Sequence, residues 1–143
     1  MTSLVLTSLV ETSLVLDTHT AIWYLVLDAR LSTEALRTIR AAATAGKRCF
    51  VPSICLVEAT YLVEKNRIAE ATFGLLREAL TRGQSNLVLA PLDLAVTRAL
   101  RNVPRDEVPD LPDRVIAATA VALGLPLITR DGKIRASGIR TVW

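Results

Sequence analysis

Four acidic residues are spaced along this chain so that a parallel sheet would bring their carboxylates together. They are Asp17, Glu58, Asp113 and Asp131. The first and last come at the ends of apolar segments typical of strands, whereas the middle two lie in the opening turns of expected helices. Because ligands of an open α/β sheet bind at the carboxyl ends of its strands, we expect the four side chains to meet at one edge. Acids gathered there repel one another unless a cation joins them, so the pattern predicts a Mg²⁺ site that acts on phosphates.

The elements that must position these acids are expected to alternate between strands and helices. Strands are predicted at residues 13–16, 48–51, 87–89, 125–129 and 139–142, the last at a sheet edge. Helices are predicted at residues 18–26, 32–45, 53–65, 68–81, 92–101 and 110–123, with a short helix or turn at 131–136. Such alternation is typical of a parallel sheet with right-handed crossovers, so the expected class is α/β, with four to five strands flanked by helices.

Three of the predicted helices begin at residues whose side chains suit the N-cap position. Ser32, Ser53 and Asp110 each carry an oxygen that can accept a hydrogen bond from the backbone of the first turn. Pro112 falls just inside the last of these helices, where its missing N–H would have no partner in any case. Gly124 then marks the end of that helix.

Composition predicts one domain with an aliphatic core and excludes a disordered chain. The chain has 143 residues, which is the length of a single domain, and 22% of them are charged. Apolar residues make up 51% and aromatic residues only 4%, a mixture that suits helices packed on a buried parallel sheet. The aromatic residue Trp23 is interpreted as core or interface packing. A net charge of +3 permits binding to nucleic acid without requiring it.

The two cysteines and the N-terminal segment indicate a cytoplasmic protein. Cys49 and Cys55 form neither a zinc motif nor a disulfide framework, so they are interpreted as buried thiols in a reducing compartment. Residues 2–16 contain three near-copies of a five-residue unit, TSLVL, TSLVE and TSLVL. This segment lacks the basic start of a signal peptide, and no stretch is long enough to cross a membrane. We interpret residues 1–12 as an extension, an added edge strand or a misplaced start, and residues 13–143 as the domain.

Each acid taken alone also has a structural explanation. Asp17 could cap the helix that follows it, and Asp113 could be a helix-start charge favoured by the macrodipole. Asp131, followed by Gly132, could belong to a turn. Glu58 is harder to explain in this way, because it lies among apolar residues where a charge must be offset. The joint pattern carries more weight, because separate structural explanations would all have to coincide at one edge of one sheet.

Several neighbouring residues are candidates for supporting roles. Thr129 could hydrogen-bond a phosphate or a metal-bound water, or be an ordinary β-branched strand residue, and Thr18 has the same two readings. His19 is the only histidine, so histidine-pair catalysis is excluded, and we expect a structural role near the mouth of the site. Arg114 could contact RNA phosphate or pair with a carboxylate. Asp110 could add a fifth acid or act only as a helix cap.

Four segments together give the chain its resemblance to a known family. They are residues 14–23 (LVLDTHTAIW), 51–59 (VPSICLVEA) with 65–68 (KNRI) after it, 111–120 (LPDRVIAATA) and 125–131 (LPLITRD). The chain resembles the PIN-domain nucleases, and within them the VapC-type toxins of bacterial type II toxin–antitoxin pairs. The resemblance spans about residues 13–143 and keeps the family's order and spacing. The N-terminal repeat lies outside the family's pattern.

The resemblance implies a PIN-like three-layer fold and a metal-dependent endoribonuclease. The family's acids carry over to Asp17, Glu58, Asp113 and Asp131, and Asp110 matches an additional acid of many members. Asp17 and Asp113 would hold the first ion, Mg²⁺ or alternatively Mn²⁺, and Asp131 would complete its shell. Glu58 would bind the same ion or a water between the acids. The implied partners are an RNA substrate, a small antitoxin whose arginine approaches the acids, and a second copy of the chain in a homodimer.

Other classes of protein fit the same residues less well. A catalytically weak domain that binds only RNA or protein would keep the fold, but none of the four acids is missing. A phosphatase of the haloacid dehalogenase type would need an acid at position 19, which is His19. A receiver domain would need a phosphoacceptor acid after the third strand, where Ala90 and Pro91 stand. The chain contains neither a P-loop nor a Gly-rich dinucleotide fingerprint.

Overall fold

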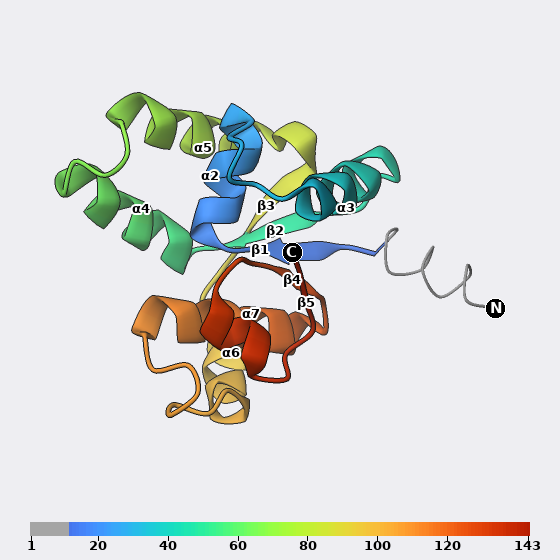
Figure 1. Ribbon diagram of the computed structural model, residues 1–143, viewed down its shortest axis with the longest axis vertical. Helices are drawn as coiled ribbons and strands as arrows, with labels where there is room; N and C mark the ends of the chain where they lie inside the picture. Colours follow the sequence, from blue (N-terminus) through green and yellow to red (C-terminus); the bar gives the residue numbers. More distant parts are fainter. Residues whose placement is uncertain (1–11) are drawn as a thin grey trace.

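The computed structural model describes residues 12–143 and shows a five-stranded, fully parallel sheet covered by helices (Figure 1). The strands are β1 (Leu14–Leu16), β2 (Cys49–Pro52), β3 (Leu87–Ala90), β4 (Leu127–Ile128) and β5 (Thr141–Val142). Their order in the sheet is β3-β2-β1-β4-β5. The α/β class and the parallel sheet of five strands are therefore confirmed.

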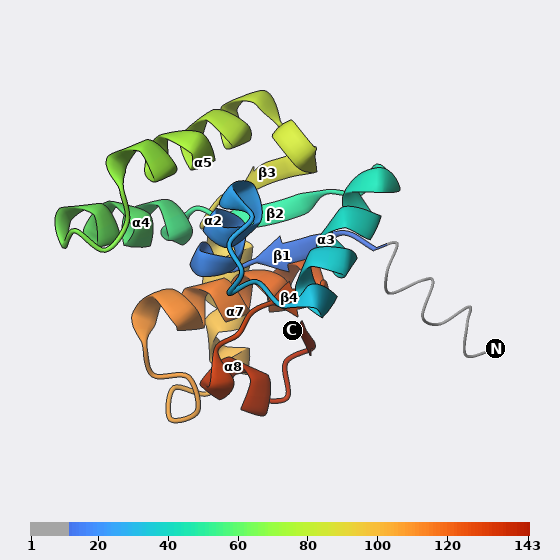
Figure 2. The same cartoon turned by 45° about the horizontal axis from the view of Figure 1, so that its top comes forward.

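Seven α-helices and several short turns lie between and around these strands in the described residues. The helices are α2 (Thr18–Val26), α3 (Thr33–Thr44), α4 (Ile54–Glu64), α5 (Glu70–Arg82), α6 (Leu94–Ala99), α7 (Leu111–Leu123) and α8 (Gly132–Ala136). Two short 3₁₀ helices, η1 (Gln84–Asn86) and η2 (Leu100–Asn102), complete the set. Helices α2, α3 and α5 lie on one side of the sheet and α6, α7 and α8 on the other, which gives three layers (Figures 1 and 2).

The strand order creates a switch point at β1, in the middle of the sheet. From β1 the chain builds β2 and β3 outward on one side, then returns to build β4 and β5 on the other. Val15 donates from its backbone N–H to Pro126 across this junction, and Asp17 donates to Ile128 one step further along. The connections after β1 and β4 therefore leave the sheet in opposite directions, which opens a crevice at their carboxyl ends.

The core is aliphatic, as composition predicts. All three residues of β1 and both residues of β4 are fully buried. Ile116 of α7 packs in the same cluster, and Trp23 of α2 is also part of it, which confirms its place in the core. Each such fully buried side chain contributes about 1.5–3 kcal/mol to folding. The fully buried strands β1 and β4 thus form the part of the sheet edge from which Asp17 and Asp131 follow.

Three helix starts differ from the sequence-based prediction. The helix expected from residue 68 begins at Glu70. Ser53 does not cap α4: its hydroxyl accepts a hydrogen bond from the backbone N–H of Leu92 at 3.0 Å, across the β3–α6 connection. The helix predicted to start at Leu92 begins at Leu94 instead, because Asp93 is its N-cap and accepts from Val96 at 3.0 Å. Capping at Ser32 and Asp110 is confirmed.

Both cysteines are buried free thiols, as predicted. Burial raises the pKa of the Cys49 thiol to about 11 and raises that of Cys55 further. Neither thiol therefore ionises near neutral pH, and neither has the character of a nucleophile or a metal ligand.

Along the described residues 12–143, no helix combines the length and the apolar character needed to cross a membrane. The extension was predicted at residues 1–12, of which residues 1–11 lie outside the described part of the chain. The boundary placed between an extension and a domain at residue 13 stays a prediction.

Candidate active site

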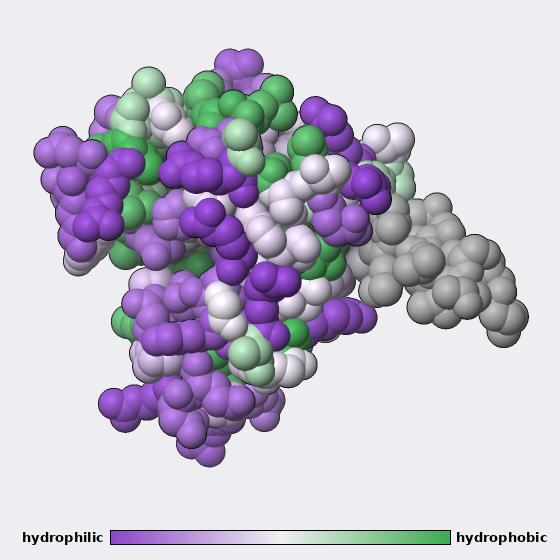
Figure 3. Space-filling model, in the orientation of Figure 1, coloured by the Kyte–Doolittle hydropathy of each residue, from purple (hydrophilic) through white to green (hydrophobic). Residues whose placement is uncertain are grey.

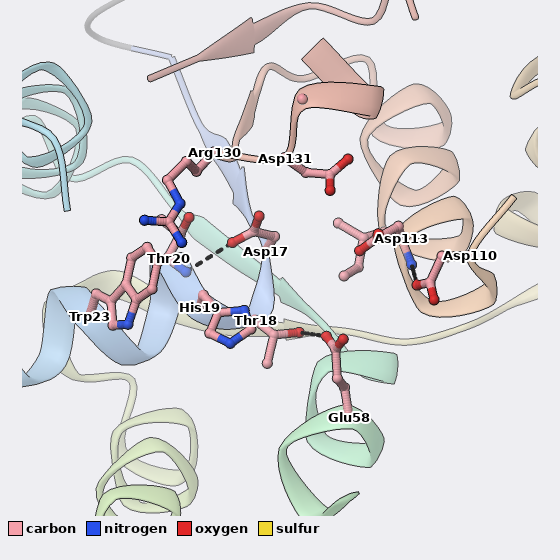
Figure 4. A pocket seen from close by; sticks show the side chains of 12 residues that line it. Asp17, Thr18, His19, Thr20, Trp23, Glu58, Asp110, Asp113, Arg130 and Asp131 are labelled. Carbon is pink, nitrogen blue, oxygen red and sulfur yellow. Dashed lines mark hydrogen bonds between the residues drawn. The ribbon is translucent and has the colours of Figure 1, made fainter. Parts of the chain in front are cut away.

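A cavity of about 450 Å³ opens at the carboxyl edge of β1 and β4, and carboxylates dominate its lining (Figure 4). The lining residues are Asp17, Thr18, His19, Thr20, Trp23, Glu58, Asp110, Asp113, Ile116, Arg130, Asp131 and Gly132. The structure thus brings together all four acids singled out in the sequence, and adds Asp110. They come from four helices or their N-caps, α2, α4, α7 and α8, so only the folded chain assembles them.

Asp17 ends β1 and is held in place from two sides. Its Oδ1 accepts a hydrogen bond from the backbone N–H of Thr20 at 2.9 Å, which caps α2. Its Oδ2 accepts a hydrogen bond from the hydroxyl of Thr129 at the end of β4. The capping explanation is therefore correct for this residue, and it is compatible with a site role because the same bonds aim the carboxylate into the cavity.

The hydroxyl of Thr129 ties the two central strands together. The side chain is fully buried, and its Oγ1 donates to Asp17 while accepting from the backbone N–H of Asp131 at 3.0 Å. Asp131 in turn caps α8 by accepting from Ile134 at 2.9 Å. Thr129 is therefore neither a free phosphate ligand nor an ordinary strand residue in this structure, because its hydroxyl sets the relative position of two acids.

Replacing Thr129 with valine tests this link. Valine keeps the shape but removes the donor to Asp17 and the acceptor for Asp131, so we expect the free energy of unfolding to fall by about 1–3 kcal/mol. The control is Thr129→Ser, which keeps the hydroxyl and loses only a buried methyl group worth about 1 kcal/mol. Urea denaturation of the three proteins measures the difference. Equal or greater stability of the valine variant relative to the serine variant would contradict the proposed link.

Glu58 and Asp110 are also held in place by hydrogen bonds. Glu58 reaches the cavity from α4 and accepts a hydrogen bond from the hydroxyl of Thr18, which is itself buried. Asp110 caps α7 by accepting from the backbone N–H of Asp113 at 3.1 Å. The carboxylates are thus positioned by the protein itself, so their arrangement is part of the fold.

The electrostatic cost of this arrangement is concentrated on Asp113. Its pKa rises from 3.8 to about 7, chiefly because burial disfavours the charged form, and further because of the negative charges of neighbouring acids. In order of decreasing effect these are Asp131, Asp110, Glu58 and Asp17. The metal-free site therefore retains a proton near neutral pH. A cation entering the cavity would reduce the repulsion among the carboxylates and displace this proton.

The donor set suits a hard divalent cation bound partly through water. All the candidate ligands are carboxylate oxygens, which Mg²⁺ prefers, and neither buried thiol lines the cavity. Within residues 12–143, no three His, Cys, Asp or Glu side chains are grouped closely enough to ligate one ion directly. Mg²⁺ commonly keeps several waters and uses only one or two carboxylates, so this spacing fits Mg²⁺ better than a cation that needs an all-protein cage.

The remaining predicted residues divide between the cavity and the protein interior. His19 is exposed at the cavity mouth, as expected. Arg114 does not line the cavity: its guanidinium donates to the backbone carbonyls of Val103 at 2.9 Å and Leu100 at 3.0 Å. This arginine fastens α7 to η2 in place of contacting a phosphate or a carboxylate.

Arg130 lines the cavity and was missed by sequence reasoning. Its guanidinium carbon lies 4.6 Å from the centroid of the Trp23 ring, on the cavity wall. The sequence places it between Thr129 and Asp131, two residues that were singled out, and this position was the available signal. The spacing does not reveal that the guanidinium rests on the ring of Trp23, which lies 107 positions earlier.

A family model described as PIN domain matches residues 14–138, so this chain belongs to the PIN domain family. The match covers the whole sheet up to β4 and every acid of the cavity. The family is one of nucleases, which places the chain among enzymes that hydrolyse phosphodiester bonds. No curated protein matches the chain.

Solved structures with the same fold include chains from bacterial protein pairs. The chain is similar to one in the crystal structure of VapBC2 from Rickettsia felis bound to a promoter DNA fragment: TM-score 0.66, 19% identity, with 90% of this chain and 96% of that one covered. FitAcB from Neisseria gonorrhoeae gives TM-score 0.58 and 19% identity, covering 90% and 95%. FitAB bound to an IR36 DNA fragment gives 0.55 and 17%, covering 90% and 92%. Identities this low establish a shared fold, while function has to be argued from the site.

Proposed function

We propose that this protein is a Mg²⁺- or Mn²⁺-dependent endoribonuclease that acts as the toxin of a toxin–antitoxin pair. The observation that supports this most directly is the convergence of five carboxylates on one cavity, with Asp113 burdened by a pKa of about 7. A protein that binds no cation here would be more stable with one of these acids replaced, because like charges at close range repel one another. Membership of a nuclease family and the likeness to VapBC2 and FitAB chains support the same assignment.

The residues of the cavity have distinct roles in this proposal. Asp17, Asp113 and Asp131 would hold the cation, one or two of them directly and the rest through its waters, and Glu58 would bind the same ion or a water beside it. The bound cation supplies Lewis-acid chemistry, which activates a water and neutralises charge on the scissile phosphate. Thr129 and Thr18 keep the carboxylates of Asp17 and Glu58 in fixed positions. No side chain then has to reorganise as the phosphate enters, which is how preorganised sites lower a barrier.

The proposal includes a small antitoxin and a second copy of the chain. An antitoxin arginine entering the cavity would neutralise the same carboxylates as the cation and so block the site. Several large apolar side chains are exposed on α4 and α5, and the surface over these helices shows hydrophobic residues among hydrophilic ones (Figure 3). They are Val57, Tyr61 and Leu75. Exposed apolar side chains of this kind favour contact with a protein partner.

Incubation of the purified protein with a total-RNA pool and with a tRNA pool tests the activity. We expect cleavage in Mg²⁺ or Mn²⁺ and none in EDTA, with an identically purified Asp17→Asn protein as the control for contaminating ribonuclease. Cleavage that persists in EDTA, or that the Asp17→Asn preparation matches, would contradict the metal-dependent mechanism. RNA binding without cleavage in either metal would favour the catalytically weak binding module instead.

The partnership is tested separately by affinity purification from the organism that encodes the chain. A small protein that co-purifies and inhibits cleavage is the expected result, and size-exclusion chromatography with light scattering reports whether the chain is a dimer. Isolation of an active protein with no small partner would count against the toxin assignment while leaving the nuclease assignment intact.

A further inference from the structure

The feature that the proposed mechanism leaves unused is the guanidinium of Arg130. Arg130 is exposed, and it is the only arginine or lysine among the residues that line the acidic cavity. Its side chain extends from the end of β4 toward Trp23 and away from the carboxylate of Asp131 (Figure 4). The guanidinium carbon rests 4.6 Å from the centre of the Trp23 ring, within the range of a cation–π contact.

A second arginine, Arg30, contacts the same ring but differs from Arg130 in having an anionic partner. Arg30 also lies over Trp23, at 4.9 Å, but its guanidinium forms two hydrogen bonds with Asp28, at 3.0 and 2.8 Å. It therefore already has an anionic partner. Salt bridges in the described part of the chain join Arg30 to Asp28, Arg37 to Glu34, Arg77 to Glu70 and Arg82 to Glu78. Arg130 takes part in none of them, although it shares a cavity with five carboxylates.

The ring explains how the guanidinium stays apart from the acids. An exposed arginine beside carboxylates would ordinarily turn toward them, because its long side chain is flexible. Trp23 is buried and fixed by packing, with Trp143 6.1 Å and His19 5.3 Å from it between ring centres. A guanidinium resting on this immobile surface keeps its N–H donors directed outward, where an anion at the mouth could accept two of them.

We propose that Arg130, held on the ring of Trp23, is a substrate-binding residue that grips a phosphate of the RNA next to the scissile one. This role rests on the proposed ribonuclease function and adds to it an explanation of how a polyanion approaches a cavity of like charge. The contact recognises the backbone and not the base, so Arg130 contributes affinity and register on the strand without selecting sequence.

Binding of a fluorescent single-stranded RNA pool tests the proposal without depending on cleavage. The measurements use the full chain carrying Asp17→Asn, in Mg²⁺, over a series of salt concentrations. We expect Arg130→Gln to weaken RNA binding by roughly tenfold or more, since a hydrogen-bonded ionic contact is lost. We also expect the slope of log affinity against log salt to become shallower by about 0.7, the value for one phosphate contact on a single strand. Arg130→Lys keeps the charge and should restore the slope while recovering only part of the affinity.

Arg40→Gln is the matched control, because Arg40 is an exposed arginine on α3 and does not line the cavity. It should leave both affinity and slope unchanged. Thermal melting of each variant distinguishes a loss of RNA binding from a loss of stability. An Arg130→Gln protein that melts earlier but binds RNA with unchanged affinity and slope would show that Arg130 only covers Trp23, and would overturn the proposal. If no variant, including the parent, binds RNA, the proposed ribonuclease function fails and the role of Arg130 fails with it.

Discussion

Replacement of Asp17 by asparagine is expected to reduce RNA cleavage at least about 100-fold while leaving the protein folded. The cation's stabilisation of a phosphoryl transition state is worth several kcal/mol, and each 1.36 kcal/mol is about tenfold in rate. Asparagine keeps an oxygen that can cap α2 by accepting from Thr20, so the helix retains its start. It lacks the negative charge that a cation needs.

The comparison with Asp17→Ala separates the two roles of this side chain. Alanine removes both the charge and the cap, so it should lose the same activity and, in addition, about 1 kcal/mol of stability. Initial rates on the RNA pool and urea denaturation of both variants provide the measurements. A folded Asp17→Asn protein with undiminished cleavage would reduce Asp17 to a helix cap, which is the structural explanation that the sequence alone left open.

Replacement of Asp113 by asparagine is expected to abolish cleavage in the same way and, in contrast, to stabilise the metal-free protein. The folded chain holds the proton of Asp113 up to a pKa of about 7, whereas the unfolded chain releases it near 3.8. Between these values the unfolded state binds fewer protons, so stability falls as pH rises through this window. Asparagine removes that loss. After discounting for solvent screening of a half-buried group, we expect a gain of about 1–2 kcal/mol at pH values above the window.

The pH dependence gives this prediction a definite sign. Denaturation in EDTA should show the asparagine variant more stable than the parent above pH 7, and the difference should shrink as pH falls toward 4. Asp106→Asn is the control, because it removes one exposed negative charge outside the cavity. A stability difference for Asp113→Asn that does not vary with pH, or a loss of stability, would mean that neither burial nor repulsion among the acids raises the pKa of this residue as described. Mg²⁺ added to the parent should reduce the difference in stability between the parent and the Asp113→Asn variant.

The sequence predicted those parts of the fold that depend on local signals. Helix α7 begins after Asp110 and ends at Gly124 because both residues act through their nearest neighbours. Ser53 was misread because its hydroxyl serves Leu92, 39 positions away, and no local spacing reveals such a partner. Helix α6 was misplaced for a different reason: its start is set by Asp93, which caps Val96 three residues on, and the prediction took the apolar residue before it instead.

The site divides in the same way. Alternating strands and helices were enough to predict that Asp17, Glu58, Asp113 and Asp131 gather at one edge, because parallel topology places strand ends together. The link through Thr129 and the resting place of Arg130 depend on side-chain directions that only tertiary packing fixes. The raised pKa of Asp113 is likewise a property of the assembled group, since three of the acids that raise it, Asp17, Glu58 and Asp131, come from other parts of the chain.

The neighbouring pair Trp23 and Trp143, whose rings are tilted by 58° to each other, gives the protein a built-in optical probe. These are the only two tryptophans in the sequence, and they lie 6.1 Å apart between ring centres beside the cavity. Intrinsic fluorescence excited at the indole band therefore reports on a single corner of the molecule, where β5 meets α2. Ligands that move Arg130 off the ring will change this emission without any attached dye. An unfolding curve followed by emission alone will describe that corner, and comparison with far-ultraviolet circular dichroism will show whether it frays before the remaining sheet.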